Sequence, residues 1–294
     1  MTAAPRISVG LPVYNGLPYL EGALASLLAQ DTDFELVIAD NCSTDGTQDI
    51  CRDLARTDER VRYLRRDRNL GVVGNHNQII HDCRGELFSF AASDDEYRAD
   101  RLSRLAAALD AQPDAVTAIS AAEEIDSAGR VLLEWHNSIR TDHPDAIVRM
   151  KAKLAEPVFN LQLYGLHRRA ALAACRPQAP IKGSDRILIV ELALRGRFTV
   201  VDEPLLRHRN HDRRDSESVD SHGFRASQGL PPRRVSVPNA EDGVWLLRAV
   251  GNVPLSRRDR VRAYAGMSVW LRHNAVPMVR NVARAARTGR RPRG

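Results

Sequence analysis

The stretch RISVGLPVYNGLPYLEGALASLLAQDTDFELVIADNCSTDGT, residues 6–47, holds two short apolar runs separated by one amphipathic segment. The runs at 7–13 and 35–40 have the length and composition of buried strands, whereas the segment at 20–30 has a helical repeat. Two strands joined by a helix form the unit from which parallel sheets are built. This stretch therefore predicts an α/β fold with a mostly parallel sheet.

The same alternation continues to about residue 109 and then becomes irregular. We expect further strands at 61–64, 86–92, 115–120, 130–135 and 198–202. We expect further helices at 45–56, 72–83, 101–111, 187–195, 243–250 and 257–273. Ser43, Thr44 and Ser184 are the candidate helix caps. The stretch 208–239 is rich in Arg, Ser, Asp, Gly and Pro, which predicts a long loop.

The net charge of +6 is concentrated near the C-terminus, where residues 257–294 carry eleven arginines and one acid, Asp259. The rest of the chain is slightly acidic, and no nucleic-acid-binding motif is present, so we expect no nucleic-acid partner. Met267, Val269 and Trp270 lie among the arginines, a pattern typical of a helix on an anionic membrane surface. A solvated helical surface is the alternative interpretation.

Cysteine usage and hydropathy indicate the cellular compartment. Cys42, Cys51, Cys83 and Cys175 form no CxxC pair or zinc spacing, and they are interpreted as reduced thiols. There is no secretory leader pattern, and no apolar run approaches the roughly 20 residues that span a bilayer. We expect a cytoplasmic protein, with the possibility of peripheral attachment to the inner face of the membrane.

Polar residues follow three of the expected strands, and ligands bind at the carboxyl ends of strands in such sheets. Asn15 follows the first strand, Asp40 ends the second, and the acids Asp94, Asp95 and Glu96 follow the fourth. Adjacent carboxylates repel each other unless a cation or a hydrogen-bond donor neutralises them. Mg²⁺ and Mn²⁺ prefer such oxygen ligands together with substrate phosphates. The alternative is that these acids stabilise the helix that begins near residue 100.

Four motifs in this region keep a fixed order: PVYNG at 12–16, ADNCSTDGT at 39–47, NLGVVGNHN at 69–77 and ASDDEYRADRL at 92–102. Together they resemble family 2 glycosyltransferases across roughly the first 110 residues. The resemblance implies a GT-A fold, in which a Rossmann-like nucleotide-binding sheet is continuous with an acceptor-binding half. It also implies an inverting mechanism and a divalent cofactor, Mn²⁺ or Mg²⁺.

Carried onto this chain, the resemblance implies a nucleotide pocket lined by several residues of the first half. They are Pro12, Tyr14, Asn15, Asp40 and Arg68, with Asp94 on the ribose. Asp95 would bind the metal, although the DDE sequence leaves open which acid does so. Taken alone, Asp40 is equally a turn residue and Tyr14 a packing aromatic.

The second half contains the candidate base and a possible further metal ligand. Transfer needs a group that deprotonates the acceptor hydroxyl, and the resemblance assigns this to Asp185, with Glu191 as the second choice. Asp185 is also a typical acid at a helix N-terminus. Arg209 and His211 match the family's Arg-x-His stretch. His211 is a candidate metal or phosphate ligand, and Arg213 and Arg214 are candidates for the diphosphate.

These features predict a glycosyltransferase that moves a sugar from a UDP- or dTDP-linked donor to a glycan, lipid-linked or small-molecule acceptor. The expected parts are a nucleotide-sugar-binding half at 1–110, an acceptor-binding half at 111–207, a flexible loop at 208–240 and basic helices at 241–294. A catalytically silent scaffold of the same fold is the main alternative. A nucleotidyltransferase is another, but the Gly-rich basic loop that it needs after the first strand is missing.

Overall fold

A computed structural model describes residues 5–137, 139–156, 160–211, 221–231 and 238–288. The strands are β1 (Ile7–Val13), β2 (Phe34–Asp40), β3 (Val61–Arg65), β4 (Leu87–Phe90), β5 (Glu96–Tyr97), β6 (Ala115–Ile125), β7 (Val131–Trp135), β8 (Leu166–Arg168) and β9 (Arg197–Arg209). The helices of the first half are α1 (Leu20–Leu28), α2 (Thr47–Thr57), α3 (Gly71–Asp82) and α4 (Arg101–Ala111). They are followed by α5 (Ala146–Ala155), the 3₁₀ helix η1 (Leu161–Tyr164), α6 (Arg169–Ala173), α7 (Ser184–Arg195), α9 (Ser221–Ser227), α10 (Pro238–Asn252), α11 (Arg257–Gly266) and α12 (Ser268–Thr288).

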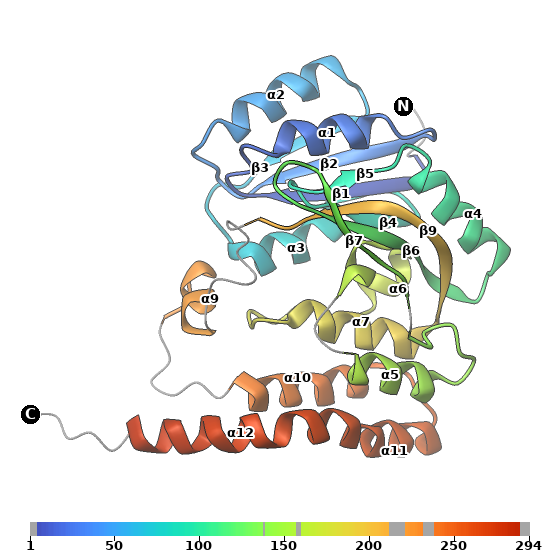
Figure 1. Ribbon diagram of the computed structural model, residues 1–294, viewed down its shortest axis with the longest axis vertical. Helices are drawn as coiled ribbons and strands as arrows, with labels where there is room; N and C mark the ends of the chain where they lie inside the picture. The colour runs from blue at the N-terminus through green and yellow to red at the C-terminus, as the bar shows by residue number, and fades with distance from the viewer. Residues whose placement is uncertain (1–4, 138, 157–159, 212–220, 232–237, 289–294) are drawn as a thin grey trace, which may run out of the picture.

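One curled sheet runs through both halves of the chain (Figure 1). The strand order is β3-β2-β1-β4-β8-β6-β9-β5, with β7 paired to the side of β6. Strands β1 to β4 are mutually parallel where they pair, and β6 runs parallel to β9. β8 is antiparallel to both β4 and β6, so it joins the two parallel groups. The expected sheet, continuous with a second half and followed by C-terminal helices, is confirmed.

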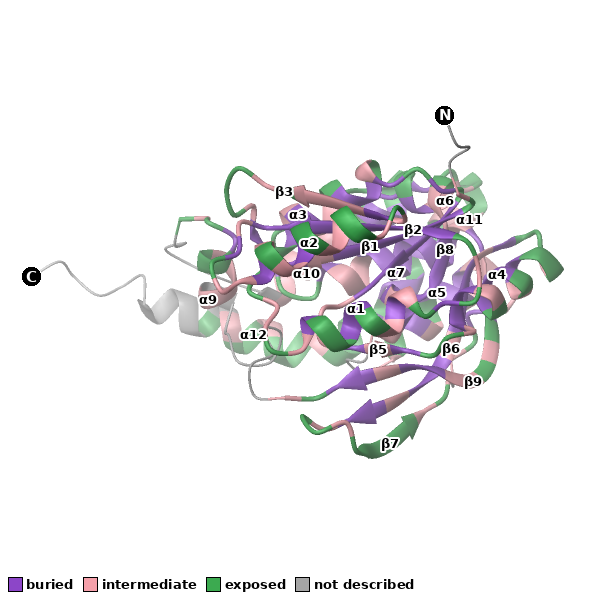
Figure 2. Cartoon of the chain, turned by 90° about the horizontal axis from the view of Figure 1, so that it is seen from above, coloured by how far each residue is buried: buried purple, intermediate pink, exposed green. Residues whose placement is uncertain are grey.

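Helices cover both faces of this sheet, which explains why its central strands are apolar on both sides. Along β2, Leu36 and Ile38 pack into one core with α1, α2 and α4, whereas Val37 and Ala39 pack into another with α3, α6 and α7. The interior strands are accordingly buried, while β7 is exposed at the edge (Figure 2). The buried strands place their polar C-terminal residues at one edge of the sheet.

The structure corrects several expectations about where elements and helix caps lie. β9 continues to Arg209, and α9 lies within the stretch expected to be a loop; residues 212–220 and 232–237 are outside the described ranges. The helix expected at 187–195 begins at Ser184, after Gly183 with a φ of 79°. Ser184 is therefore the first helical residue and does not cap the helix. Likewise, Gly46 precedes α2, and neither Ser43 nor Thr44 caps it.

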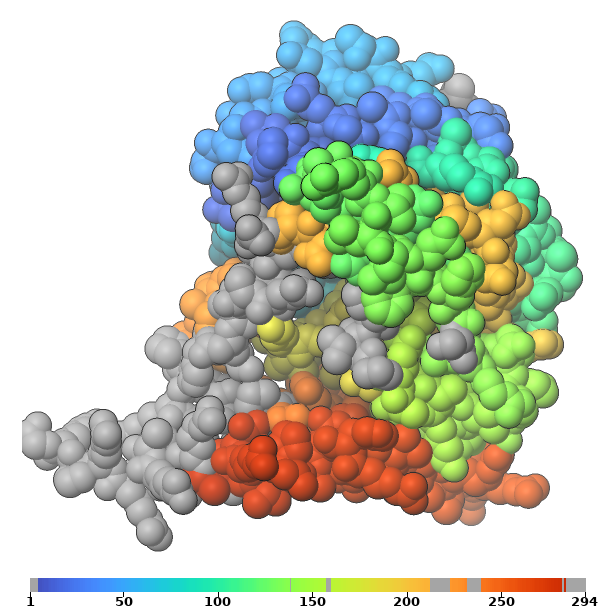
Figure 3. Space-filling model, in the orientation of Figure 1, coloured from blue at the N-terminus to red at the C-terminus, as the bar shows by residue number. Residues whose placement is uncertain are grey.

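The C-terminal helices are part of the folded body. α11 and α12 form a layer along the lower edge of the molecule (Figure 3). Met267 and Trp270 are each 5% exposed in a third core that includes α5, α7 and α10, and Val269 packs against this core. The side chains that suggested a membrane-facing surface are thus used for packing instead. Within the described residues, no helix has both the length and the apolar character needed to cross a bilayer.

Candidate functional site

The loops after β1 and β2 are tied together and leave one aromatic ring exposed. The backbone N–H of Asn15 donates to Ser43 Oγ at 2.9 Å, and Asn15 Oδ1 accepts from the Thr44 N–H at 2.9 Å. Asn15 has a φ of 52°, a conformation that Asn tolerates better than most residues. Pro12 is half-buried, and Tyr14 is 48% exposed. The connection between the loops positions Tyr14 at the carboxyl edge of the sheet.

Asp40, at the end of β2, is fully buried and already has several partners. Its Oδ2 accepts from Tyr63 Oη at 2.6 Å and from Arg65 Nη1 at 2.7 Å, and its Oδ1 accepts from the Ser43 N–H at 2.8 Å. Burial raises the pKa of Asp40, but these hydrogen bonds lower it by more, so its pKa lies below the ordinary value. Asp40 thus fixes the turn beside the expected nucleotide pocket. Direct contact of Asp40 with the nucleotide base stays a prediction. The same contact for Arg68, which is exposed, also stays a prediction.

Asp94 and His211 face each other across the site. Asp94 follows β4, and His211 lies two residues beyond the end of β9; their Oδ2 and Nε2 atoms are 3.0 Å apart. The Asp94 side chain is 27% exposed and that of His211 is 10% exposed. Burial, and after it the Asp95 carboxylate, raise the pKa of Asp94. At the carboxyl end of a parallel strand, the pair therefore places a carboxyl group whose charged form is disfavoured beside an imidazole.

Asp95 has a different environment, because it is completely buried. Its Oδ1 accepts from the Arg209 N–H at 2.9 Å and lies 3.0 Å from His208 Nδ1. Its Oδ2 lies 3.1 Å from the same imidazole nitrogen. Asp95 thus connects the end of β4 to β9 and brings His211 within reach of Asp94. The sequence reading missed His208, because a histidine in a charged run gave no signal of its own.

Asp185, the expected base, lies in the first turn of α7 and is half-buried. Asn160 Nδ2 donates to its Oδ2 at 2.8 Å, which orients the carboxylate. Asn160 was also missed, since its neighbourhood carries no motif. Asn160 directly precedes the short helix η1, so its side chain links Asp185 to that helix.

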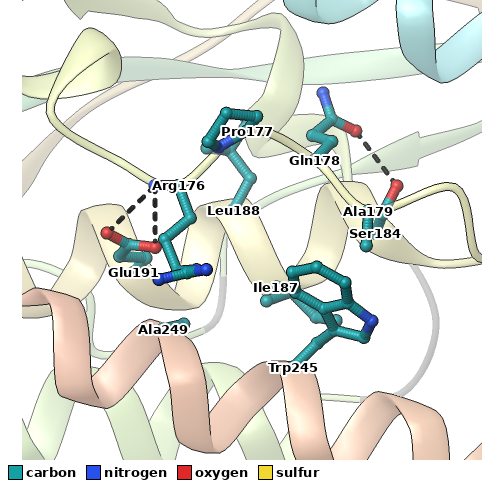
Figure 4. Close-up of a pocket in the computed structure, with 10 residues that line it drawn as sticks. All are labelled: Arg176, Pro177, Gln178, Ala179, Ser184, Ile187, Leu188, Glu191, Trp245 and Ala249. Atoms are coloured by element: carbon teal, nitrogen blue, oxygen red, sulfur yellow. Dashed lines mark hydrogen bonds between the residues drawn. The ribbon is translucent and has the colours of Figure 1, made fainter.

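Glu191, the second candidate for the base, has a structural role. It is 1% exposed, and its carboxylate accepts from the Arg176 N–H, from Arg195 Nη2 at 2.8 Å and from Asn252 Nδ2 at 2.6 Å. Figure 4 shows Glu191 turned toward the backbone of Arg176 beside a cavity of about 10 Å³ between α7 and α10. That volume holds at most one water molecule. Neither this residue nor this cavity is suited to catalysis.

The residues at this edge fit a cation that is bound largely by a substrate. Among the described residues, no group of three or more His, Cys, Asp or Glu side chains has the arrangement of a complete metal site. Mg²⁺ and Mn²⁺ sites at phosphates commonly use one or two protein ligands, with phosphate oxygens and water completing the shell. Asp94 Oδ2 and His211 Nε2, which are 3.0 Å apart, would be the two protein ligand atoms of such a site. Asp95 is less suited, because its oxygens already accept from β9.

Comparison with known proteins agrees with this architecture. The teichuronic acid biosynthesis glycosyltransferase TuaG of Bacillus subtilis, itself named as putative, is 35% identical over 101 residues, which cover 34% of this chain and 40% of that protein. The match therefore spans about two fifths of that relative. Its 101 residues are close in number to the roughly 110 residues over which the four motifs lie.

Solved structures match over almost the whole chain. S. aureus TarS 1–349 in complex with UDP-GlcNAc gives a TM-score of 0.67 at 16% identity, covering 96% of this chain and 81% of that one. The mannosyltransferase PcManGT of Pyrobaculum calidifontis, in complex with GDP-Man and Mn²⁺, gives 0.55 at 18% identity, covering 97% and 80%. These likenesses establish a shared fold. The model of glycosyl transferase family 2 matches residues 8–167, more than half of the sequence, and the chain belongs to that family.

Proposed function

We propose that the protein is an inverting, metal-dependent glycosyltransferase that moves a sugar from a UDP- or dTDP-linked donor to an acceptor hydroxyl. The observation that carries the proposal is the pair of adjacent acids after β4, Asp94 partly exposed and Asp95 fully buried, each facing a histidine contributed by the end of β9. TarS in complex with UDP-GlcNAc and PcManGT in complex with GDP-Man and Mn²⁺ share the fold and support a nucleotide-sugar donor.

The proposed roles follow from the position and exposure of the acids and histidines at the ends of β4 and β9. Asp94 and His211 would hold Mn²⁺ or Mg²⁺, while Asp95 keeps β9 in place. This differs from the expectation that Asp95 binds the metal and Asp94 the ribose, and the reason is that Asp95 has no exposed surface. When bound, the cation neutralises the charge that develops on the leaving diphosphate. Arg213 and Arg214, also expected near the phosphates, lie outside the described residues.

Asp185 would accept the proton of the acceptor hydroxyl while that oxygen attacks the anomeric carbon. The bond from carbon to the diphosphate oxygen breaks in the same step, so the configuration at the carbon is inverted. Asn160 fixes one carboxylate oxygen of Asp185 at 2.8 Å, which leaves the other available to the acceptor. General-base catalysis of this kind needs such a positioned carboxylate.

A calorimetric titration with UDP, dTDP and GDP, each with and without Mn²⁺, tests the donor and the cation. We expect one nucleotide to bind only with metal, and Asp94→Ala to lose that binding. Glu59→Gln, which changes an exposed carboxylate in the turn between α2 and β3, is the control. Binding of no nucleotide would reject the donor assignment and favour the silent scaffold. Pyrophosphate release from a nucleoside triphosphate would favour the nucleotidyltransferase.

We also propose that the C-terminal helices attach the protein to an anionic membrane surface, where a lipid-linked acceptor would be met. The buried face of α12 excludes Trp270 from this role, but its outer face carries Val276 and Val279, 58% and 66% exposed, beside Arg272 and Arg280. Apolar side chains flanked by arginines suit the boundary between head groups and acyl chains.

Vesicle flotation tests this attachment. The wild type should float at low salt with vesicles containing phosphatidylglycerol and stay in solution with vesicles of phosphatidylcholine alone. The double variant Arg272→Gln with Arg280→Gln should float less. Equal flotation with both vesicle types, or none with either, would refute the proposal.

A further inference from the structure

A cavity of about 50 Å³ lies between the β6–β7 hairpin and the segment that contains η1. Its lining is mixed, with one large aromatic ring, two aliphatic side chains and several groups able to form hydrogen bonds: Ile119, Ser120, Trp135, His136, Asn137, Glu156, Leu161 and Gln162. At about 10–15 Å³ for each water, the space holds a few water molecules. It is several times larger than the cavity beside Glu191.

Two sets of hydrogen bonds connect the lining of this cavity to the residues next to the proposed metal ligand and the proposed base. On one side, Trp135 Nε1 donates to Glu124 Oε2 at 3.2 Å, and Asn210 Nδ2 donates to Glu124 Oε1 at 2.8 Å. Asn210 directly precedes His211. On the other side, the lining residue Leu161 directly follows Asn160, which holds Asp185. An acceptor hydroxyl has to lie between the leaving group and the base, so the cavity is where the acceptor is needed.

Two buried amide oxygens, one in the cavity lining and one next to it in the chain, have no donor. Asn137 Oδ1 belongs to a lining residue and Asn160 Oδ1 to the neighbour of the lining residue Leu161, and neither has a hydrogen-bond partner among the described residues. Buried polar atoms are normally paired, and leaving one unpaired costs about 1–3 kcal/mol. The amide nitrogens of both residues are already in use, toward Ile139 O at 3.1 Å and toward Asp185. What is missing is therefore a ligand that donates hydrogen bonds.

The floor of the cavity is held rigidly. Lys153 is 1% exposed, and its Nζ donates to Glu156 Oε2 at 2.5 Å and to Gln162 Oε1 at 2.8 Å. This network fixes the two polar side chains that line the cavity from the side of α5. A binding site whose polar groups are held in place in advance loses less entropy when a ligand binds.

We propose that this cavity receives one hydroxyl-bearing edge of a sugar ring of the acceptor, with the apolar face of the ring on Trp135 and a hydroxyl of that edge donating to Asn137 Oδ1. The inference rests on the proposed function and specifies its acceptor as a glycan. A sugar presents the hydroxyl donor that Asn137 Oδ1 lacks, together with a C–H face that suits an indole ring. A purely apolar lipid chain would leave that oxygen unpaired.

Fluorine NMR of protein labelled with 5-fluorotryptophan tests the subsite directly. The three signals are assigned from Trp135→Phe, Trp245→Phe and Trp270→Phe, and the protein is titrated with methyl glycosides of glucose, galactose, mannose and N-acetylglucosamine. We expect at least one glycoside to shift the Trp135 signal saturably and leave the other two unmoved. Asn137→Leu should weaken that binding about tenfold or more, because it removes the unpaired oxygen.

Leu133→Ala is the matched control, since Leu133 is on the same face of β7 as Trp135 but does not line the cavity. It should leave the glycoside titration unchanged. Nucleotide binding is measured on each sample. If nucleotide binds and no glycoside moves the Trp135 signal, the subsite is refuted while the donor assignment stands. If neither nucleotide nor glycoside binds, the proposed function is refuted together with the subsite. Equal weakening by Leu133→Ala and Asn137→Leu would also refute the subsite.

Discussion

Individual carboxylates in this protein differ in burial and in hydrogen-bond partners, and therefore in role. The sequence pattern alone does not distinguish them. Asp94 and Asp95 are neighbours, yet one is partly exposed beside a single imidazole and the other is buried among several partners on β9. Asp185 and Glu191 share a helix, yet Glu191 is enclosed by three donors, whereas Asp185 is half-buried and accepts a hydrogen bond from Asn160. Exposure thus separates carboxylates that can meet a substrate from those that hold the fold.

The first prediction concerns the proposed base. Asp185→Asn should lower the transfer rate by about 10²–10⁴, because an amide cannot accept the acceptor proton. Nucleotide affinity should stay unchanged, since Asp185 does not touch the donor in the proposed arrangement. Initial rates and the calorimetric titration measure the two quantities. A rate within a few-fold of wild type would exclude Asp185 as the base.

The second prediction concerns Asp95 and separates a structural role from a metal ligand. Asp95→Asn should lower the free energy of unfolding by about 2–3 kcal/mol, because the new amide nitrogen would face His208 or the Arg209 N–H, and hydrogen bonds to a charge are lost. Urea unfolding measures this, with Glu59→Gln as an exposed control that should change it by less than about 0.5 kcal/mol. Unchanged stability together with lost metal binding would instead identify Asp95 as the metal ligand.

At the scale of elements, the stretch after β9 is anchored to the nucleotide-binding half. Gln228, directly after α9, accepts at Oε1 from the Val73 N–H at 3.0 Å, in the first turn of α3. Gly71 begins that helix with a φ of 74°, and a Cβ there would lie 2.5 Å from Gln228 Oε1 and 2.7 Å from its Cα. The absence of a side chain at Gly71 is what lets α9 approach α3.

The third prediction follows from that contact. Gly71→Ala should cost about 1–3 kcal/mol through backbone strain and overpacking, and should displace α9. Trypsin should then cleave faster after Arg225. Gly22→Ala is the control, because nothing lies within 4 Å of a Cβ there, and it should be neutral or slightly stabilising. If both variants were cleaved at the wild-type rate, the contact would not hold α9 in place.

At the scale of the whole molecule, the C-terminal helices share a hydrophobic core with α5 and α7. Trp270 lies on Gly243 of α10, where a Cβ would be 2.7 Å from the ring, and both belong to the layer that covers α5 and α7. α7 in turn carries Asp185. The layer therefore supports the helix from which the proposed base projects.

The fourth prediction tests this coupling. Trp270→Ala should lower the free energy of unfolding by about 3–5 kcal/mol, because a large buried ring is replaced by a cavity. Unfolding in urea, followed by circular dichroism, should remain a single transition at a lower midpoint. Val279→Ala, on the exposed face of α12, should leave the midpoint almost unchanged. A separate early transition in Trp270→Ala would indicate that the C-terminal helices unfold independently.

The sequence by itself determined the family and, apart from the two-residue strand β5, the order of strands and helices in the first 110 residues, and it marked the candidate site residues that follow β1, β2 and β4. These are local properties, since apolar periodicity and short motifs are carried by neighbouring residues. It also marked Asp94, Asp185 and His211 as candidates. It did not reveal β8, which is three residues long, or the use of Trp270 in a core.

Only the tertiary structure decided which side chains meet. Asp95 and His208 are 113 residues apart, Asn160 and Asp185 are 25 apart, and Gln228 reaches Val73 across 155 residues. No pattern within a window of sequence encodes such pairs, because they depend on how β9 lies beside β6 and how α7 packs under the sheet. The difference between Asp94 and Asp95 has the same origin: whether a carboxylate is free for a ligand depends on solvent exposure, which the packing of distant segments sets.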